Sequence, residues 1–412
     1  MPLKLESAVP IAIFALTYFV IAAGKLPRLR LDRVGAALAG AVAMVAIGGL
    51  GEREALAAVD FPTLGLLLGM MIVVANLRLS GALGAAARAL IARSRSGFGI
   101  LAMTILASGV LAAFFINDVV CLALAPIVIE LAEMVDTAPA PFLLALATAS
   151  NIGSAATITG NPQNMIVAGF AHLGYRAFVL RMAPAAIAGL AIDYAVIAFI
   201  YRMELRAIGP RAAAIRLRPV RGSAWFRAKS AAIAIGALAA FVLGYRTDLT
   251  ALAAGAISLF TRRVKPGRVY RLVDWTMLLM FGGLFIVVAG AEQTGFQNAL
   301  VRSIGVGRLT NTAVLTVVVA ALSNLVSNVP AVMLFRPLYH SLALGPQAAL
   351  VIAGASTFAG NLTVVGSIAN LIVIEQARRE RIEIGFGEYM RVGVPVTILT
   401  MAAGIAMIAA GI

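Results

Sequence analysis

Long apolar runs recur along the whole chain, and they limit its possible folds more than any other feature. Hydrophobic residues make up 61% of the 412 residues and charged residues only 12%, whereas soluble domains are nearer half apolar and a quarter charged. The longer runs reach the about 18 residues with which a helix crosses a bilayer, and the weak alternating pattern of a membrane β-barrel is absent. The sequence therefore predicts an all-α polytopic membrane protein, because helices satisfy their own backbone in lipid.

The predicted spans follow one another from end to end, and two of them are interrupted by polar residues. The first run lacks a basic start and a small-residue cleavage pattern, so it is interpreted as a span and not as a signal peptide. The expected segments are 8–24, 33–50, 60–79, 97–116, 119–135, 140–172 (interrupted), 183–201, 230–245, 248–261, 274–293, 310–326, 331–344, 346–373 (interrupted) and 392–411.

The net charge of +15 is concentrated in loops. Basic residues collect in 24–33, 88–95, 202–229 and 262–271, whereas 51–59 holds two acids and one arginine. The positive-inside rule places the basic loops in the cytoplasm and 51–59 outside, in an inner membrane. We interpret the charge as a topology signal that meets anionic lipid headgroups, and not as a nucleic-acid footprint.

The two sides of the central loop resemble each other in sequence. Segment 59–83 aligns without gaps to 273–297, and two further segments follow in the same order. The aligned pairs are Asp60/Asp274, Gly69/Gly283, Val73/Val287, Val74/Val288, Gly81/Gly295, Asn117/Asn328, Pro126/Pro337, Thr157/Thr363, Gly160/Gly366 and Asn164/Asn370. Three segments in one order indicate a duplication.

The loop charges give the two copies opposite directions across the membrane. Segment 60–79 is expected to run inward and 274–293 outward. The chain is therefore predicted to hold a first inverted repeat (1–201), a basic cytoplasmic linker (202–229) and a second inverted repeat (230–412). Inverted repeats are typical of secondary transporters, whose site lies where the repeats meet near the midplane.

Polar and helix-breaking residues in the middle of both interrupted spans indicate broken helices. Around Gly160 the helix is expected to unwind, with Asn161 as the cap and Pro162 as the first residue of a new half-helix. Freed backbone groups at membrane depth are tolerable only where they face a polar cavity or a ligand. The alternative is that these small residues only permit close helix packing.

Two further polar points separate pairs of apolar stretches and indicate re-entrant hairpins. The alternation of inside and outside loops does not distinguish such a hairpin from two full crossings. Asn117 and Asp118 are expected to cap one helix start, and Ser327, Asn328 and Pro330 mark the other. Each repeat is then expected to contain scaffold helices, one hairpin and one broken helix.

The motif Asn–Ile–Gly–x–Ala–Ala–Thr–x–x–Gly–Asn–Pro–x–Asn (151–164), preceded by the Asn-tipped hairpin with Pro126, resembles the ion-transporter superfamily. That group includes citrate/metal symporters, divalent-anion/sodium symporters, the melanosomal P protein, arsenite permeases and a type of sodium/proton antiporter. The resemblance covers nearly the whole chain, and it implies a scaffold and a transport unit of two hairpins and two broken helices.

The hairpin tips differ from those of the divalent-anion branch, which carry Ser–Asn–Thr. Ser327 and Asn328 match at the second tip, only Asn117 matches at the first, and neither threonine is present. The Asn–Asp of the first tip looks more like the arsenite-permease branch, whereas the 151–164 motif looks more like the citrate and P-protein branches.

The candidate site residues follow from these tips and breaks. Amide groups and the amides of half-helix N-termini are expected to bind substrate oxygens, and carbonyls near the two breaks are expected to hold the coupling ion with Asp118. The expected substrate-binding residues are Asn117, Asn164, Ser327, Asn328, Asn370, Thr157 and Thr363, and the expected coupling residues are Asp118, Asn151, Gly160, Asn161, Asn361 and Gly366.

A few other residues carry competing interpretations. Asp193 lies in the middle of a span, where it either takes part in transport or only forms hydrogen bonds within the scaffold. Arg336 either attracts anions or snorkels to the surface, and Cys121 either touches a thiophilic solute or only packs. Four residues are expected at membrane interfaces: His172, His340, Arg78 and Glu292.

The first functional hypothesis is a secondary transporter of a small anion or neutral oxyacid, arsenite-like slightly ahead of carboxylate, driven by a proton or sodium gradient. A sodium/proton antiporter that uses Asp118 is the alternative, and an ion channel is a third. No nucleotide-binding motif is present, so a gradient or an external ATPase subunit must supply energy. No cofactor or enzyme activity is expected beyond bound Na⁺ or H⁺, and a homodimer is a further expectation.

Overall fold

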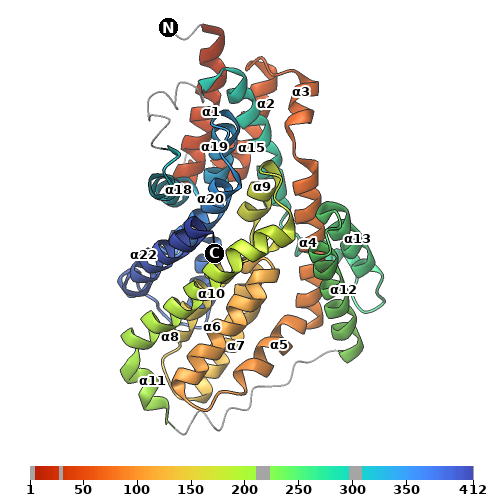
Figure 1. The fold of residues 1–412 in the computed structure, drawn as a ribbon. Helices are drawn as coiled ribbons and strands as arrows, with labels where there is room; N and C mark the ends of the chain where they lie inside the picture. The colour runs from red at the N-terminus through yellow and green to blue at the C-terminus, as the bar shows by residue number, and fades with distance from the viewer. Residues whose placement is uncertain (1–4, 27–30, 210–222, 297–308, 412) are drawn as a thin grey trace.

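The computed structural model describes residues 5–26, 31–209, 223–296 and 309–411, and these residues are almost entirely helical (Figure 1). The predicted all-α membrane fold is confirmed. Parts of the predicted basic loops, including Arg28, Arg30 and Arg216, lie outside the described residues.

The first half of the chain contains both interrupted and continuous helices. Its elements are α1 (Leu5–Ala23), β1 (Lys25–Leu26), β2 (Leu31–Asp32), α2 (Arg33–Ala46), α3 (Glu52–Ala58), α4 (Phe61–Ser80), α5 (Ala82–Ile91), α6 (Gly97–Phe114), α7 (Asn117–Met134), α8 (Ala140–Ser154), the 3₁₀ helix η1 (Ile158–Gly160), α9 (Pro162–Phe170), α10 (Tyr175–Ile200) and α11 (Arg202–Ile208). The two short strands pair antiparallel.

The second half repeats this pattern of long helices and one interrupted helix. Its described elements are α12 (Ala224–Val242), α13 (Thr247–Leu259), α14 (Pro266–Tyr270), α15 (Trp275–Gln293), α18 (Thr312–Val326), α19 (Asn328–Ser341), α20 (Pro346–Ala359), the 3₁₀ helix η3 (Val364–Gly366), α21 (Ile368–Arg379) and α22 (Phe386–Ala410).

The described part includes six helices long and apolar enough to cross a membrane: α4, α6, α10, α12, α15 and α22. Shorter apolar helices, among them α8, α18 and α20, make up much of the remainder. The predicted spans overlap these helices throughout, and the interruptions predicted in 140–172 and 346–373 are present. Within the predicted linker, α11 and the first turns of α12 are helical, and 210–222 lies outside the described residues.

The aligned residues Asp60 and Asp274 start their helices in the same way. Each is an N-cap with φ near −80° and ψ near 80°, and its carboxylate accepts the backbone N–H three residues on, from Thr63 and Met277. Because a carboxylate satisfies one of the four free N–H groups of a helix start, these two positions set where α4 and α15 begin.

The two halves interlock instead of forming separate bodies. Helix α13 packs on α4 at Gly69, whose hydrogen lies against the backbone of Ala251, and α2 packs on α15 at the aligned Gly283, against the backbone of Ala37. Figure 1 shows the green helices α12 and α13 alongside α4. Elements from each predicted repeat therefore support the other, while the inverted duplication itself stays a prediction.

The helix pairs that carry the tips lie toward opposite ends of the molecule. Helices α6 and α7 lie with α5 toward one end, and α18 and α19 lie with α1 toward the other (Figure 1). Their connections, at 115–116 and at Ser327, meet in the interior beside the two helix breaks.

Candidate functional site

The two broken helices have the same internal hydrogen bonds. The side-chain amide of Asn164 donates to the carbonyls of Ser154 (3.0 Å) and Thr157 (2.8 Å). The aligned Asn370 donates to the carbonyls of Gly360 (2.8 Å) and Thr363 (3.1 Å). Each asparagine thereby satisfies carbonyls that the break leaves without an intrahelical partner.

The second half of each broken helix begins at a capped residue. Asn161 caps α9 by accepting the N–H of Asn164 (2.9 Å), with Pro162 as the first helical residue. The predicted cap at Asn161 and helix start at Pro162 are therefore confirmed. At the aligned position Ser367 caps α21 by accepting the N–H of Ala369 (3.2 Å).

Asn151 ties the two breaks to the first tip. Its oxygen accepts hydrogen bonds from Asn117 (2.8 Å) and Ser367 (2.9 Å), and its amide group donates to Asn361 (2.8 Å) and Asn370 (3.0 Å). A side-chain amide has two acceptor sites and two donor protons. Asn151 uses all of them with 1% of its surface exposed, so α7, α8 and α21 are fixed to one another at this residue.

The first tip differs from its predicted form. The N-cap of α7 is Ile116, which makes no side-chain cap bond, and Asn117 is the first helical residue. The prediction that Asn117 and Asp118 form a capping pair is wrong, because the Asn117 amide is turned toward Asn151. At the second tip Ser327 has φ of 80° and Asn328 begins α19, with its oxygen accepting from Ser323 (2.7 Å).

Both tips and the starts of both second half-helices line one cavity of about 40 Å³. Its lining residues are Asn117, Asp118, Pro162, Gln163, Met277, Ser327, Asn328, Val329, Ser367 and Ile368. The helices α7, α9, α19 and α21 therefore all begin at this cavity. Among its lining residues Asp118 is the single carboxylate, and Asp274 is a second acid whose charge acts on it.

The predicted site residues divide into two groups by position. Four line the cavity: Asn117, Asp118, Ser327 and Asn328. The others support the breaks behind it: Thr157, Gly160, Asn161, Asn164, Asn151, Asn361, Thr363, Gly366 and Asn370. The Thr157 hydroxyl donates to the Ala113 carbonyl, and the Thr363 hydroxyl lacks a partner among the described residues.

Sequence reasoning missed Gln163, Ser367 and Met277 as cavity residues. The sequence did contain a signal for Gln163 and for Ser367. Gln163 is part of the polar 149–168 stretch, and Ser367 aligns with Asn161 in the duplication. Met277 carries no polar group and no motif, so only packing brings it to the site.

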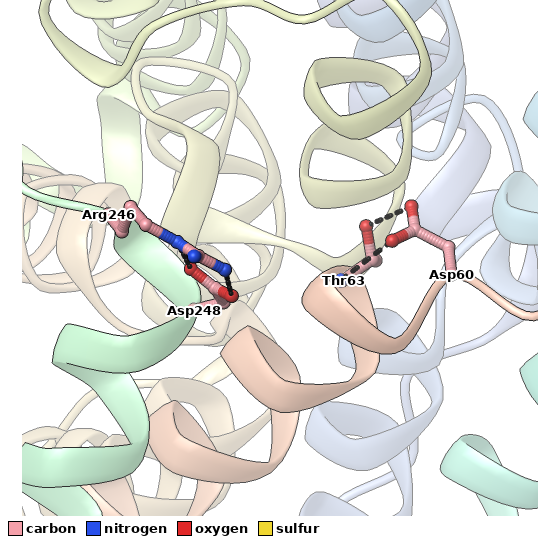
Figure 2. A network of polar contacts seen from close by, with 4 residues as sticks. All are labelled: Asp60, Thr63, Arg246 and Asp248. Carbon is pink, nitrogen blue, oxygen red and sulfur yellow. Dashed lines mark hydrogen bonds and ion pairs between the residues drawn. The ribbon is translucent and has the colours of Figure 1, made fainter.

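A larger cavity of about 440 Å³ opens beside the start of α4 and reaches Ile158 in the first break. Asp60, Asp248, His172, Arg336 and His340 are among its lining residues. Figure 2 shows two polar pairs at helix starts by this cavity, where Thr63 bonds to Asp60 (2.6 Å) and Arg246 to Asp248 (2.8 Å). The larger cavity therefore lies beside the first break and shares no lining residue with the small one.

The remaining singled-out residues lie away from the small cavity. The Cys121 sulfur is 3.0 Å from the Ser150 hydroxyl, packed between α7 and α8. Asp193 is buried on α10. Arg78 and Glu292 lie in the last turns of α4 and α15, and the Arg336 guanidinium lies over the Phe285 ring at 5.6 Å.

Known proteins match this chain along nearly all of its length. The model of the citrate transporter family matches residues 16–347. The silicon efflux transporter LSI3 of Oryza sativa subsp. japonica is 30% identical, over 93% of this chain and 94% of that protein. A 46 kDa membrane protein of Mycobacterium leprae is 30% identical over 97% of each chain, and a transporter named arsB from Dictyostelium discoideum is 24% identical over 96% and 91%.

A solved structure shares the fold. The YdaH transporter of Alcanivorax borkumensis aligns over 99% of this chain and 98% of its own, with a TM-score of 0.59 and 16% identity. The superfamily resemblance of the 151–164 motif is confirmed by these matches. The chain is a multi-pass membrane transporter and belongs to the citrate transporter family.

Proposed function

We propose that the protein is a gradient-coupled secondary transporter of a small neutral oxyacid or small monoanion, with arsenite-like solutes ahead of carboxylates. The observation that carries this proposal is the meeting of four helix N-termini, α7, α9, α19 and α21, at one cavity. Free N–H groups and aligned peptide dipoles at helix starts favour anions and electron-rich oxygens.

The charge balance of the cavity favours a solute of low charge. Each helix start acts as roughly +0.5 elementary charge, so four starts contribute about +2. An ionised Asp118 reduces this to about +1, and the nearby Asp274 lowers it further. A monoanion or a neutral oxyacid matches this balance, whereas citrate at neutral pH carries more negative charge than the cavity can offset. The volume of about 40 Å³ also suits a solute of a few heavy atoms.

The polar groups of the cavity match an oxyacid in both hydrogen-bonding directions. Asn117, Gln163 and Asn328 can donate to its oxygens, and the Asp118 carboxylate can accept from its hydroxyl groups. Two relatives, the silicon efflux transporter LSI3 and the transporter arsB, support this solute class. Asp118 also serves as the site where a proton or sodium ion binds with the solute.

Transport follows from movement of the tips and half-helices against the other helices. The hairpins α6–α7 and α18–α19 with the two broken helices form the moving unit, and alternating access exposes the cavity to each side in turn. We place the protein in the inner membrane with the 202–229 loop in the cytoplasm. A homodimer, and less so an external ATPase subunit, are further proposals.

Uptake into proteoliposomes tests the function directly. Arsenite, silicic acid, sulfate, succinate and citrate are each offered with and without sodium and pH gradients. We expect saturable accumulation of arsenite or silicic acid under one gradient. Accumulation of only the di- and trianions would contradict the charge argument, and non-saturable flux would indicate a channel.

Substitution of the two tips tests the location of the site. Asn117→Ala and Asn328→Ala are each expected to reduce uptake strongly while expression persists, because each removes a polar group at the cavity, at about 1–3 kcal/mol. Asn311→Ser is the matched control, because Asn311 caps α18 at the surface and a serine retains the cap. Normal uptake by both alanine variants would move the site elsewhere.

Asp118→Asn separates coupled transport from sodium/proton exchange. In a coupled transporter the variant keeps solute exchange and loses uphill accumulation, because the amide cannot carry the ion. In an antiporter the variant loses all flux, because Asp118 is then the cation site itself. The control is Glu133→Gln, at the exposed end of the same helix, and unchanged ion dependence in Asp118→Asn would exclude Asp118 from coupling.

A further inference from the structure

Asp193 lies in the middle of α10, far from both tips in the sequence, and its side chain has 0% exposure. Neither carboxyl oxygen has a hydrogen-bond partner among the described residues. An ionised carboxylate without donors or a counter-ion is strongly disfavoured at membrane depth. The group must therefore be neutral, or it must bind something.

The hydroxyl of Thr148 on α8 is a polar group near Asp193. That hydroxyl already donates its one proton to the carbonyl of Leu144, at 2.8 Å. Only the lone pairs of the Thr148 oxygen remain for Asp193. A hydrogen bond between the two side chains therefore requires that the proton come from the carboxyl group.

Helix α22 covers the other side of Asp193. Helices α10 and α22 run antiparallel, because Gly189 lies beside Thr400 and the Tyr201 hydroxyl bonds to Glu388. This places Thr397 at the level of Asp193, and its buried hydroxyl also lacks a partner among the described residues.

Among the described residues, the ionisable groups that interact with Asp193 supply no positive charge. Tyr389 of α22 interacts with it electrostatically, Cys121 of α7 lies beyond Tyr389, and Tyr194 is its neighbour on α10. Thr148, the α8 residue near it, does not ionise.

Asp193 is connected to the transport site through α8. The carbonyl of Thr148 accepts the side-chain amide of Asn361 (3.2 Å), and Asn361 accepts the amide of Asn151 (2.8 Å). The Tyr389 hydroxyl donates to the backbone carbonyl of Asn361 (3.1 Å). Movement of the broken helix against α10 and α22 would therefore change the surroundings of Asp193.

We infer that Asp193 is a second proton-binding site, separate from the small cavity, which holds a proton in this conformation and releases it when α8 moves against α10 and α22. The inference rests on the proposed gradient-coupled transport, and it adds a coupling group that makes no contact with the solute.

Infrared difference spectroscopy in liposomes tests the proton itself, independently of any solute. The carbonyl band of a protonated carboxyl group is expected at neutral pH in the wild type and in Asp118→Asn, with loss of one component in Asp193→Asn. Thr148→Val should shift that component because it removes the polar oxygen beside the carboxyl group, whereas Thr148→Ser should leave it in place. An identical band in wild type and Asp193→Asn would overturn the inference.

Transport measurements test the role of that proton. These measurements use a solute that the wild type accumulates. Asp193→Asn is expected to retain solute exchange and to lose uptake driven by a pH gradient. Asp193→Glu is expected to keep the uptake driven by a pH gradient. Unchanged pH-gradient dependence, or loss of sodium dependence instead, would overturn the inference. If the wild type accumulates none of the panel solutes, the proposed function fails while the infrared result still decides on Asp193.

Discussion

Single side chains at the helix breaks hold segments that are far apart in the sequence. Asn151 is the clearest case, because its four hydrogen bonds reach α7, the 360–367 break and α21. In a membrane interior no solvent replaces a lost partner, so the stability of this region depends on a few amides.

Asn151→Leu is expected to lower the free energy of unfolding by at least about 2 kcal/mol, because it leaves several buried polar groups without a partner. Thermal unfolding in detergent measures the change. Asn76→Leu is the matched control. Asn76 is equally buried, bonds only within its own helix to Ile72, and leaves its oxygen without a partner among the described residues. Equal losses in the two variants would show that Asn151 is not a special connection.

Gly160 and Gly366 occupy aligned positions but differ in the space around them. A Cβ at Gly160 would overlap the Ser154 carbonyl oxygen and lie 2.7 Å from Ser154 Cα. At Gly366 it would lie 2.9 Å from Gly360 O and 3.0 Å from Asn324 Oδ1, on a side chain that can move.

Gly160→Ala is therefore expected to reduce both folded yield and uptake more than Gly366→Ala. Size-exclusion chromatography and proteoliposome uptake compare the two variants. Gly174→Ala serves as the control, because a Cβ there meets nothing within 4 Å. A more severe defect in Gly366→Ala would contradict the packing seen at the first break.

At the scale of elements, close contact between helices depends on glycine. In lipid, helix pairs associate through packing and not through the hydrophobic effect, so small residues set how near two backbones approach. The pairs α4–α13 and α2–α15 use the aligned Gly69 and Gly283 for this purpose.

Gly283→Ala is expected to destabilise the protein by about 1–3 kcal/mol, because its Cβ would lie 2.7 Å from the carbonyl oxygen of Ala37, a backbone atom that cannot rotate away. Its neighbour Gly282 is the control, since a Cβ at that position meets nothing within 4 Å. Gly282→Ala should be neutral or stabilising by up to about 1 kcal/mol. Thermal unfolding of the two variants measures the difference in their stability. Equal melting temperatures would argue against tight α2–α15 packing.

At the scale of the whole molecule, the basic loops predict the orientation in the membrane. A reporter fused within 205–225 is expected in the cytoplasm and one at 51–57 outside, because lysine and arginine favour the cytoplasmic side. Arg216→Cys, outside the described residues, should resist a membrane-impermeant thiol reagent applied to intact cells. Labelling from outside would contradict the inverted-repeat hypothesis, because the opposite directions of the two repeats across the membrane are assigned from the loop charges.

Local sequence patterns were sufficient to predict the class of fold and the position of both helix breaks. Apolar runs leave only helices in lipid, and glycine, asparagine and proline within such runs mark where a helix must stop. These are local effects, so they are visible at Gly160, Asn161 and Pro162 without any partner. The exact helix starts at the tips were less visible, because Asn117 was free to cap its own helix or to bond elsewhere.

Which polar residues line the cavity and which support it depends on how the helices pack in three dimensions. Asn117 and Asn151 are both asparagines near a break, but their roles depend on neighbours from other helices. The partners of Asn151 lie up to 219 residues away, and Asp193 acquires its surroundings from α8 and α22. Sequence patterns report the path of one helix, whereas hydrogen-bond partners and buried charge depend on which helices pack together.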